Sequence, residues 1–130
     1  MEQTRTRELE DKIGTHIIEA AFEVHKILGP GLLEKVYEVC LEHELTKRGL
    51  KVERQLAVPI EYCDMVFSDA LKLDLLVENR VIVELKSAES NHKLWEAQLL
   101  SYMRLSYKKL GYLINFNAPL LKNGIRRYRI

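Results

Sequence analysis

Residues 70–77, ALKLDLLV, and 81–87, VIVELKS, are two apolar runs separated by a three-residue polar connection. Runs of this length predict buried strands, and so short a connection predicts an antiparallel hairpin. Asp74 interrupts the first run, while Glu84 and Lys86 interrupt the second. Side chains alternate faces along a strand, so Glu84 and Lys86 point the same way. Charges in such runs are costly to bury unless they are paired or bind a metal.

The register of this hairpin decides whether the two acids meet. If residues 78–80 form the loop, Val77 pairs with Val81 and Asp74 lies directly opposite Glu84. A slip of one residue would remove this alignment. Two facing carboxylates repel each other, whereas a divalent cation bound between them makes the interaction attractive. Magnesium accepts one or two carboxylates, with water and phosphate oxygens as its remaining ligands.

A second interpretation of these charges needs no metal. Asp74, Glu84 and Lys86 then face solvent on a half-exposed hairpin, and Lys86 pairs with an acid across the strands. Isolated Glu-x-Lys triplets are frequent by chance, which favours this view for the triplet alone. An aspartate ten residues upstream, inside an apolar strand, favours a site.

The remaining segments predict a mixed α/β layer fold. Helical spacing and apolar runs define the elements, and Gly29-Pro30-Gly31 either separates two helices or kinks one. Pro59 indicates an edge strand or a bulge, and residues 63–69, CDMVFSD, predict a turn. The predicted helices are 15–28, 32–48 and 92–107; the predicted strands are 51–62, 70–77, 81–87, 109–116 and 125–130. Residues 1–14 are expected to be an N-terminal extension of a single domain, 15–130.

The composition is that of a soluble globular protein. Hydrophobic residues make up 47% and charged residues 30% of 130 residues, which excludes disorder. No apolar run reaches the roughly 18 residues that a membrane span needs, and the N-terminus lacks a signal-peptide core. We therefore expect a cytoplasmic protein.

Charge is unevenly distributed along the chain. Residues 1–65 carry 9 Lys and Arg against 13 Asp and Glu, or −4; residues 66–130 carry 11 against 6, or +5. The net charge of +1 is too small for binding of nucleic acid by bulk attraction. The basic C-terminal half is either a solvated face or a local phosphate-binding surface.

Asp74 followed, after a hairpin, by Glu84-Leu85-Lys86 resembles the PD-(D/E)XK nuclease superfamily, whose core is a helix, three strands, a helix and another strand. The next predicted helix contains Gln98-Leu99-Leu100-Ser101-Tyr102, which is similar to the QxxxY element of the RecB-type exonuclease branch. Leu73 stands where the superfamily nominally has proline, a common replacement.

Three further segments resemble the small family of GxxExxY proteins. Residues 31–37 read GLLEKVY, and 25–31 and 111–116 read HKILGPG and GYLINF. The resemblance covers roughly residues 15–130. No single motif is specific, but four in the right order are. The resemblance implies an α/β restriction-endonuclease-like core in the order α(α)βββαβ(β), with helices flanking a small mixed sheet.

The resemblance also implies roles for particular residues. Asp74 and Glu84 would bind Mg²⁺, or Mn²⁺ in its place, and Lys86 would assist the attacking water. Glu34 would be a third acidic metal ligand; an acid that merely favours a helix N-terminus is the equal alternative. Gln98 and Tyr102 would support the site or contact the DNA backbone, whereas in an isolated helix they would belong to a packing stripe.

Three residues close in sequence to these candidates are expected to have structural roles. Glu38 is expected to be a surface acid, one turn beyond Glu34. Tyr37 and Trp95 are expected in the core, although stacking of Trp95 on a nucleobase is an alternative.

Two functions from different classes follow. The first is a Mg²⁺-dependent nuclease that hydrolyses phosphodiester bonds of nucleic acid. The second is a catalytically silent module of the same fold that binds nucleic acid or a protein partner. The expected partner is nucleic acid, DNA ahead of RNA, although the residues alone do not choose between them. A homodimer is a further expectation, because a nuclease core of this size often needs a second copy to grip a duplex.

Overall fold

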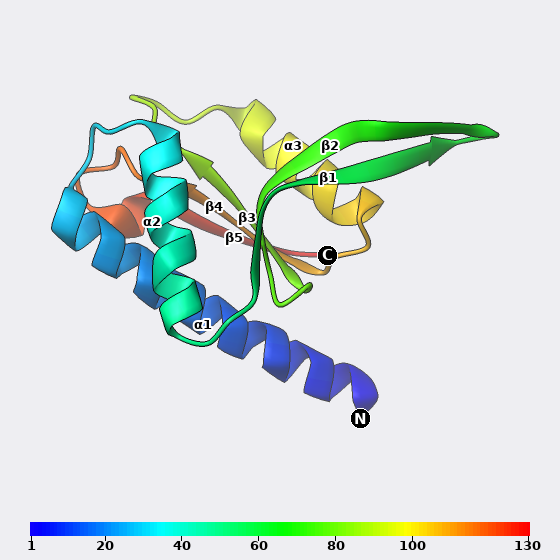
Figure 1. The fold of residues 1–130 in the computed structure, drawn as a ribbon, viewed down its shortest axis with the longest axis horizontal. Helices are drawn as coiled ribbons and strands as arrows, with labels where there is room; N and C mark the ends of the chain where they lie inside the picture. The colour runs from blue at the N-terminus through cyan, green and yellow to red at the C-terminus, as the bar shows by residue number, and fades with distance from the viewer.

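The computed structural model describes all residues 1–130 and shows a five-stranded mixed sheet flanked by helices (Figure 1). The order of elements confirms the α/β fold class predicted from the sequence. The elements are α1 (Glu2–Leu28), α2 (Glu34–Lys47), β1 (Val52–Tyr62), β2 (Met65–Val77), β3 (Val81–Lys86), α3 (Lys93–Leu105), β4 (Leu110–Asn115), a 3₁₀ turn η1 (Leu121–Gly124) and β5 (Ile125–Arg129).

The strands lie in chain order, β1-β2-β3-β4-β5. β3 and β4 pair in parallel, and α3 connects them across one face of the sheet. All other neighbouring strands pair in antiparallel fashion. The parallel pair needs a helical crossover, whereas the antiparallel neighbours are joined by tight turns or, between β4 and β5, by a loop that contains η1.

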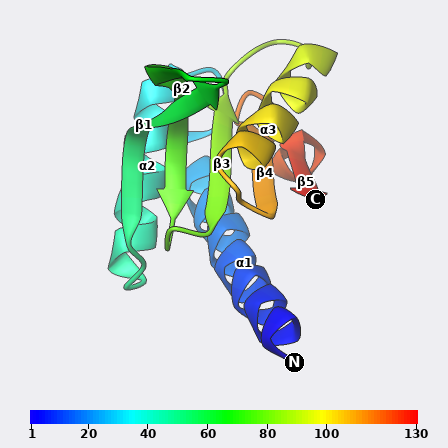
Figure 2. The ribbon, with the colours of Figure 1, turned by 90° about the vertical axis from the view of Figure 1, so that its right-hand side faces the viewer.

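Helices cover both faces of the sheet (Figure 2). α1 and α2 pack on one face over a core that includes Ile17, Leu41 and Val83. α3 packs on the other face, where Leu99 and Met103 contact a smaller core that includes Ile82. Because both faces are covered, β3 and β4 are buried almost throughout, as continuous apolar runs predict.

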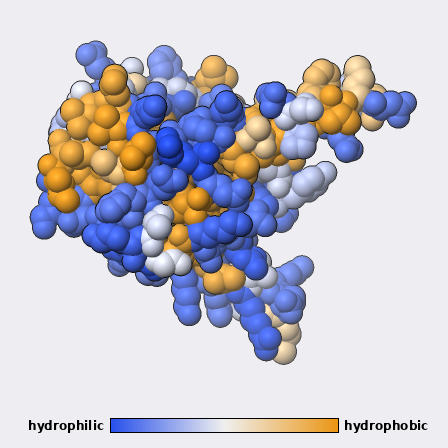
Figure 3. Space-filling model, viewed as in Figure 1, coloured by the Kyte–Doolittle hydropathy of each residue, from blue (hydrophilic) through white to orange (hydrophobic).

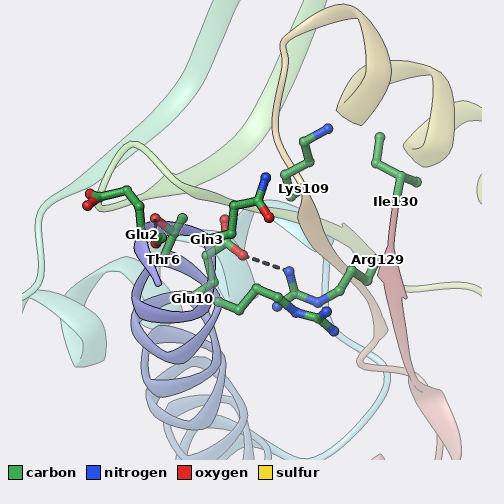
Figure 4. Close-up of a pocket in the computed structure, with 8 residues that line it drawn as sticks. Glu2, Gln3, Thr6, Glu10, Lys109, Arg129 and Ile130 are labelled. Atoms are coloured by element: carbon green, nitrogen blue, oxygen red, sulfur yellow. Dashed lines mark hydrogen bonds and ion pairs between the residues drawn. The ribbon is translucent and has the colours of Figure 1, made fainter.

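Helix α1 is much longer than the sequence pattern predicts, since it begins at Glu2 rather than Thr15. Its N-terminal half is held by tertiary contacts: buried Glu10 pairs with Arg129 of β5 at 2.7 Å, beside a surface hollow (Figure 4). A side chain at Gly14 would collide with the Tyr112 hydroxyl, so glycine lets the helix lie close against β4. None of the helices combines the length and apolar character needed to cross a membrane.

The Gly-Pro-Gly segment separates two helices and is fastened by a tyrosine. The Tyr37 hydroxyl donates to the Gly29 carbonyl oxygen at 2.6 Å and accepts from the Leu32 N–H at 3.1 Å. Its ring stacks on Phe116, with centroids 4.6 Å apart. The tyrosine of the GxxExxY segment is therefore a buried structural residue, as its core interpretation predicted.

The outer part of the β1–β2 hairpin projects from the body, and we call residues 59–70 the arm (Figure 1). Its base coincides with a register shift at Pro59, as predicted for a bulge. The predicted turn over 63–69 is wrong for most of its length, because β2 starts at Met65 and only Cys63-Asp64 turn. Apolar side chains, including Phe67, are exposed near its end (Figure 3).

Candidate active site

The β2–β3 hairpin has the register that brings the two acids together. Val77 pairs with Val81, as the three-residue loop predicted, and the ladder continues to Leu75 and Val83. Asp74 and Glu84 come next, at the point where regular pairing of the strands ends. They therefore lie beside each other where β2 diverges from β3.

At this point, hydrogen bonds from backbone N–H groups to carboxylate side chains take the place of the backbone-to-backbone hydrogen bonds between β2 and β3. The Asp74 N–H donates to Oε1 of Glu84 at 3.3 Å, and the Leu85 N–H donates to Oδ2 of Asp74 at 2.9 Å. Each carboxylate thus accepts a hydrogen bond from the backbone of the opposite strand. Alternation along β2 also breaks here, since Leu73 packs in the smaller core and Leu75 in the larger one.

The pair is short of positive charge. Glu84 is only 5% exposed, and neither it nor Asp74 forms an ion pair with a lysine or arginine. Burial first, and then the charge and side-chain hydrogen bond of Asp74, together raise the pKa of Glu84 to about 9. A metal-free Glu84 therefore holds a proton at neutral pH, and a bound cation would favour its ionised form.

Lys86 lies two residues beyond Glu84 and is half-buried. Its ammonium sits 5.4 Å from the ring centroid of Trp95 on α3, a cation–π contact. Its charge lowers the pKa of Glu84, although burial and Asp74 outweigh it. The cross-strand ion pair that the alternative interpretation needed is absent. Trp95 itself is half-buried against the smaller core, which agrees with a packing role.

Gln98 and Tyr102 face the same way on α3. Nε2 of Gln98 donates to the Tyr102 hydroxyl at 3.0 Å. The pKa of Tyr102 is raised first by burial and then by the negative charge of Glu84 and Asp74. The tyrosine hydroxyl thus lies within the electrostatic field of the acidic pair, while Gln98 is exposed beside it.

The two glutamates at the start of α2 have very different surroundings. Glu34 is exposed and makes no hydrogen bond or ion pair with Asp74 or Glu84. Glu38 is 6% exposed, so the expectation of a surface acid is wrong. Its pKa is raised mainly by burial, and the charge of Asp74 adds to this. The missed signal was its position on the stripe with buried Leu41 and Leu45.

Gln55 of β1 connects Glu38 to the pair. Its Nε2 donates to Oε2 of Glu38 at 2.9 Å and to Oδ1 of Asp74 at 3.2 Å. Arg54 also approaches Glu38, with Nη1 3.5 Å from Oε1. The sequence singled out neither residue, because a polar residue on an edge strand is ordinary and its partners are distant in the chain.

Asn115 shapes the backbone that follows Lys86. Its Oδ1 accepts from the Ala88 N–H at 3.2 Å, and its Nδ2 donates to the Ala88 carbonyl oxygen at 3.1 Å and to Asn91 at 3.0 Å. The side chain is 5% exposed and ends the otherwise apolar strand β4. An amide at the end of a buried strand was the available signal, and sequence reasoning did not use it.

An α/β core whose central hairpin presents an aspartate, a glutamate and a lysine at the end of a strand ladder belongs to the nuclease-like class. The comparison with known families agrees, since residues 11–128 match the model of the PD-(D/E)XK nuclease superfamily, and the chain belongs to that superfamily. No curated protein and no solved structure matches it. The narrower resemblance to the GxxExxY proteins stays a prediction.

Proposed function

We propose that the protein is a divalent-cation-dependent nuclease that hydrolyses phosphodiester bonds in nucleic acid. The observation that carries this proposal is the interlocked Asp74–Glu84 pair, in which Glu84 is buried, Asp74 is half-buried and neither forms an ion pair with a lysine or arginine. Membership of the nuclease superfamily supports the same reaction class. An ionised Glu84 beside Asp74 would cost stability unless a cation bound both carboxylates, and that is the state in which the pair would work.

The donor set fits Mg²⁺ better than a metal enclosed entirely by protein. The chain has no group of three or more His, Cys, Asp or Glu side chains arranged to hold an ion. Mg²⁺ needs only one or two carboxylates, because water and phosphate oxygens complete its octahedron, and Mn²⁺ accepts similar ligands. Asp74 and Glu84 would hold it. When bound, the ion would acidify a coordinated water and neutralise charge on the phosphate.

The chain's own groups would do the rest. Lys86, on the same face of β3 as Glu84, orients the attacking water or stabilises negative charge that develops on the phosphate. The cation–π contact with the indole of Trp95 restrains the ammonium group of Lys86. Tyr102 and Gln98 support the acidic pair from α3 or contact the nucleic-acid backbone.

We assign the role of third acidic residue near the cation to Glu38, in place of Glu34. Glu38 is buried and is linked to Asp74 through Gln55, whereas Glu34 points to no partner in the site. Its carboxylate would act on the ion through a bound water, because no three acidic side chains are arranged to hold an ion directly. This arrangement adds negative charge near the cation, which increases the affinity of the site.

A nuclease assay with matched lysine variants tests the proposal. Wild-type protein should cleave single-stranded DNA, duplex DNA or RNA with Mg²⁺ or Mn²⁺ and not with EDTA. Lys86→Ala should lower kcat by about 100-fold or more, while Lys12→Ala, a change at an exposed lysine on α1, should leave it unchanged. Cleavage that survives Lys86→Ala in full contradicts the assignment. Metal and nucleic-acid binding without any cleavage would favour the silent module instead.

A further inference from the structure

Gln55 has a backbone conformation that a strand residue rarely adopts. Its φ is +52°, in the left-handed region, although it lies inside β1. The other non-glycine residues with positive φ are Cys63, Glu78, Asn79 and Tyr107, which lie in turns. Such a conformation is uncommon for glutamine and costs free energy unless surrounding contacts hold it. The positive φ of Gln55 therefore indicates that contacts of this residue stabilise an otherwise unfavourable backbone conformation.

The contacts are those of the side-chain amide. Register pairs on either side, Arg54 with Leu75 and Leu56 with Leu73, place Gln55 opposite Asp74. The Nε2 group carries two hydrogens, and it donates to one carboxylate oxygen of α2 and one of β2. A single amide on β1 thus hydrogen-bonds to both α2 and β2.

The bridge counteracts a repulsion. Glu38 and Asp74 carry like charges close enough for Asp74 to raise the pKa of Glu38, whereas the Gln55 hydrogen bond opposes that shift. Oε1 of Glu38 lies 3.5 Å from Nη1 of Arg54, so the bond from Gln55 to Oε2 is the contact that connects this carboxylate to Asp74. The left-handed backbone at Gln55 coincides with the break in alternation on β2 between Leu73 and Leu75.

We propose that Gln55 is a positioning residue that ties Glu38 of α2 to Asp74 of β2 and so presets a third carboxylate beside the metal-binding pair. This inference rests on the proposed function, because it assigns Gln55 a part in cation affinity. A residue that only fills space would affect stability and leave cation affinity alone.

Gln55→Asn separates the two roles. Asparagine accepts positive φ more readily than glutamine, so the fold should be retained. Its side chain is one methylene shorter and cannot reach both carboxylates. We expect Mn²⁺ affinity, measured by calorimetry on the full chain, to fall about 10-fold or more, as for other groups that orient metal ligands. Cys63→Gly, which relieves positive φ in the arm, is the matched control and should bind Mn²⁺ like wild type.

A double-mutant cycle asks whether Gln55 acts through Glu38. If it does, Glu38→Gln and Gln55→Asn together should weaken Mn²⁺ binding little more than Glu38→Gln alone. Losses that add would overturn the proposal, as would wild-type affinity in Gln55→Asn; both results leave the nuclease function standing. Absence of Mn²⁺ binding by the wild-type protein would overturn both proposals.

Discussion

The inner and outer parts of the β1–β2 hairpin belong to the same two strands but have opposite surroundings. In the inner part, Leu73 and Leu75 are fully buried and Asp74 meets Glu84 of β3. In the arm, residues 61–70 are all exposed, Phe67 among them. The arm holds Glu61, Asp64 and Asp69 and no lysine or arginine, so it does not suit a phosphate backbone. The comparison shows that the acidic pair lies in the buried, inner part of the hairpin, where β2 diverges from β3, and not in the exposed arm.

Two aspartates on β2 give the largest expected difference. Asp74→Asn should reduce kcat at least about 100-fold, because the amide cannot supply the negative charge that a cation needs. Asp69→Asn makes the same chemical change in the arm and should leave kcat within about twofold. Steady-state cleavage assays with both variants measure this difference. Equal loss of activity in the two would mean that the arm takes part in catalysis.

Two apolar residues of β2 test the same contrast in stability. Leu73→Ala should lower the free energy of unfolding by about 3 kcal/mol, because it leaves a cavity in the smaller core. Phe67→Ala should lower it by less than about 1 kcal/mol, because the ring is already 49% exposed. Urea denaturation of both variants provides the comparison. A large loss in Phe67→Ala would show that a second copy of the chain covers the arm in solution.

Glu84 makes the stability of the metal-free protein depend on pH. Its pKa is about 9 when folded, against an ordinary value of 4.5, so the folded protein keeps a proton that the unfolded chain releases. The stability from this group is complete below about pH 4.5 and is lost as pH rises towards about 9. Glu84→Gln should remove this part of the slope, and Glu89→Gln, at an exposed position, should not. Urea denaturation in EDTA at several pH values measures how the free energy of unfolding changes with pH. The same pH dependence in Glu84→Gln and in wild type would contradict the raised pKa of Glu84.

Shortening the arm should have the smallest effect. Ile60 and Phe67 are paired, so Asn-Gly in place of residues 61–66 joins them by a favourable two-residue turn. Mn²⁺ affinity should stay within about twofold of wild type, because no residue of this segment bonds to the acidic pair. Calorimetry on the shortened protein measures it. A tenfold drop in affinity would show that the arm contributes to the cation site.

The hairpin that carries the acids was predictable because its determinants are local. A three-residue loop fixed the pairing of Val77 with Val81, and the period of two along strands then placed Glu84 and Lys86 on one face. The same local rules predicted the break at Gly29-Pro30-Gly31 and the irregularity at Pro59.

What escaped prediction depends on contacts between distant segments. The charged start of α1 has no apolar period, and its helix is secured by pairing of Glu10 with Arg129. Met65 and its neighbours looked like a turn, because antiparallel pairing with Tyr62 is not visible in local composition. Glu38 and Gln55 acquire their place only when α2, β1 and β2 meet, so no spacing in the sequence joins them.

The central claim is that Asp74 and Glu84 together hold a divalent cation, and anomalous diffraction from crystals grown with Mn²⁺ tests it most directly. We expect one strong anomalous peak about 2 Å from a carboxylate oxygen of each residue, lost in crystals of Asp74→Asn. A peak bound only elsewhere on the surface, or no peak near this pair at saturating Mn²⁺, would contradict the claim.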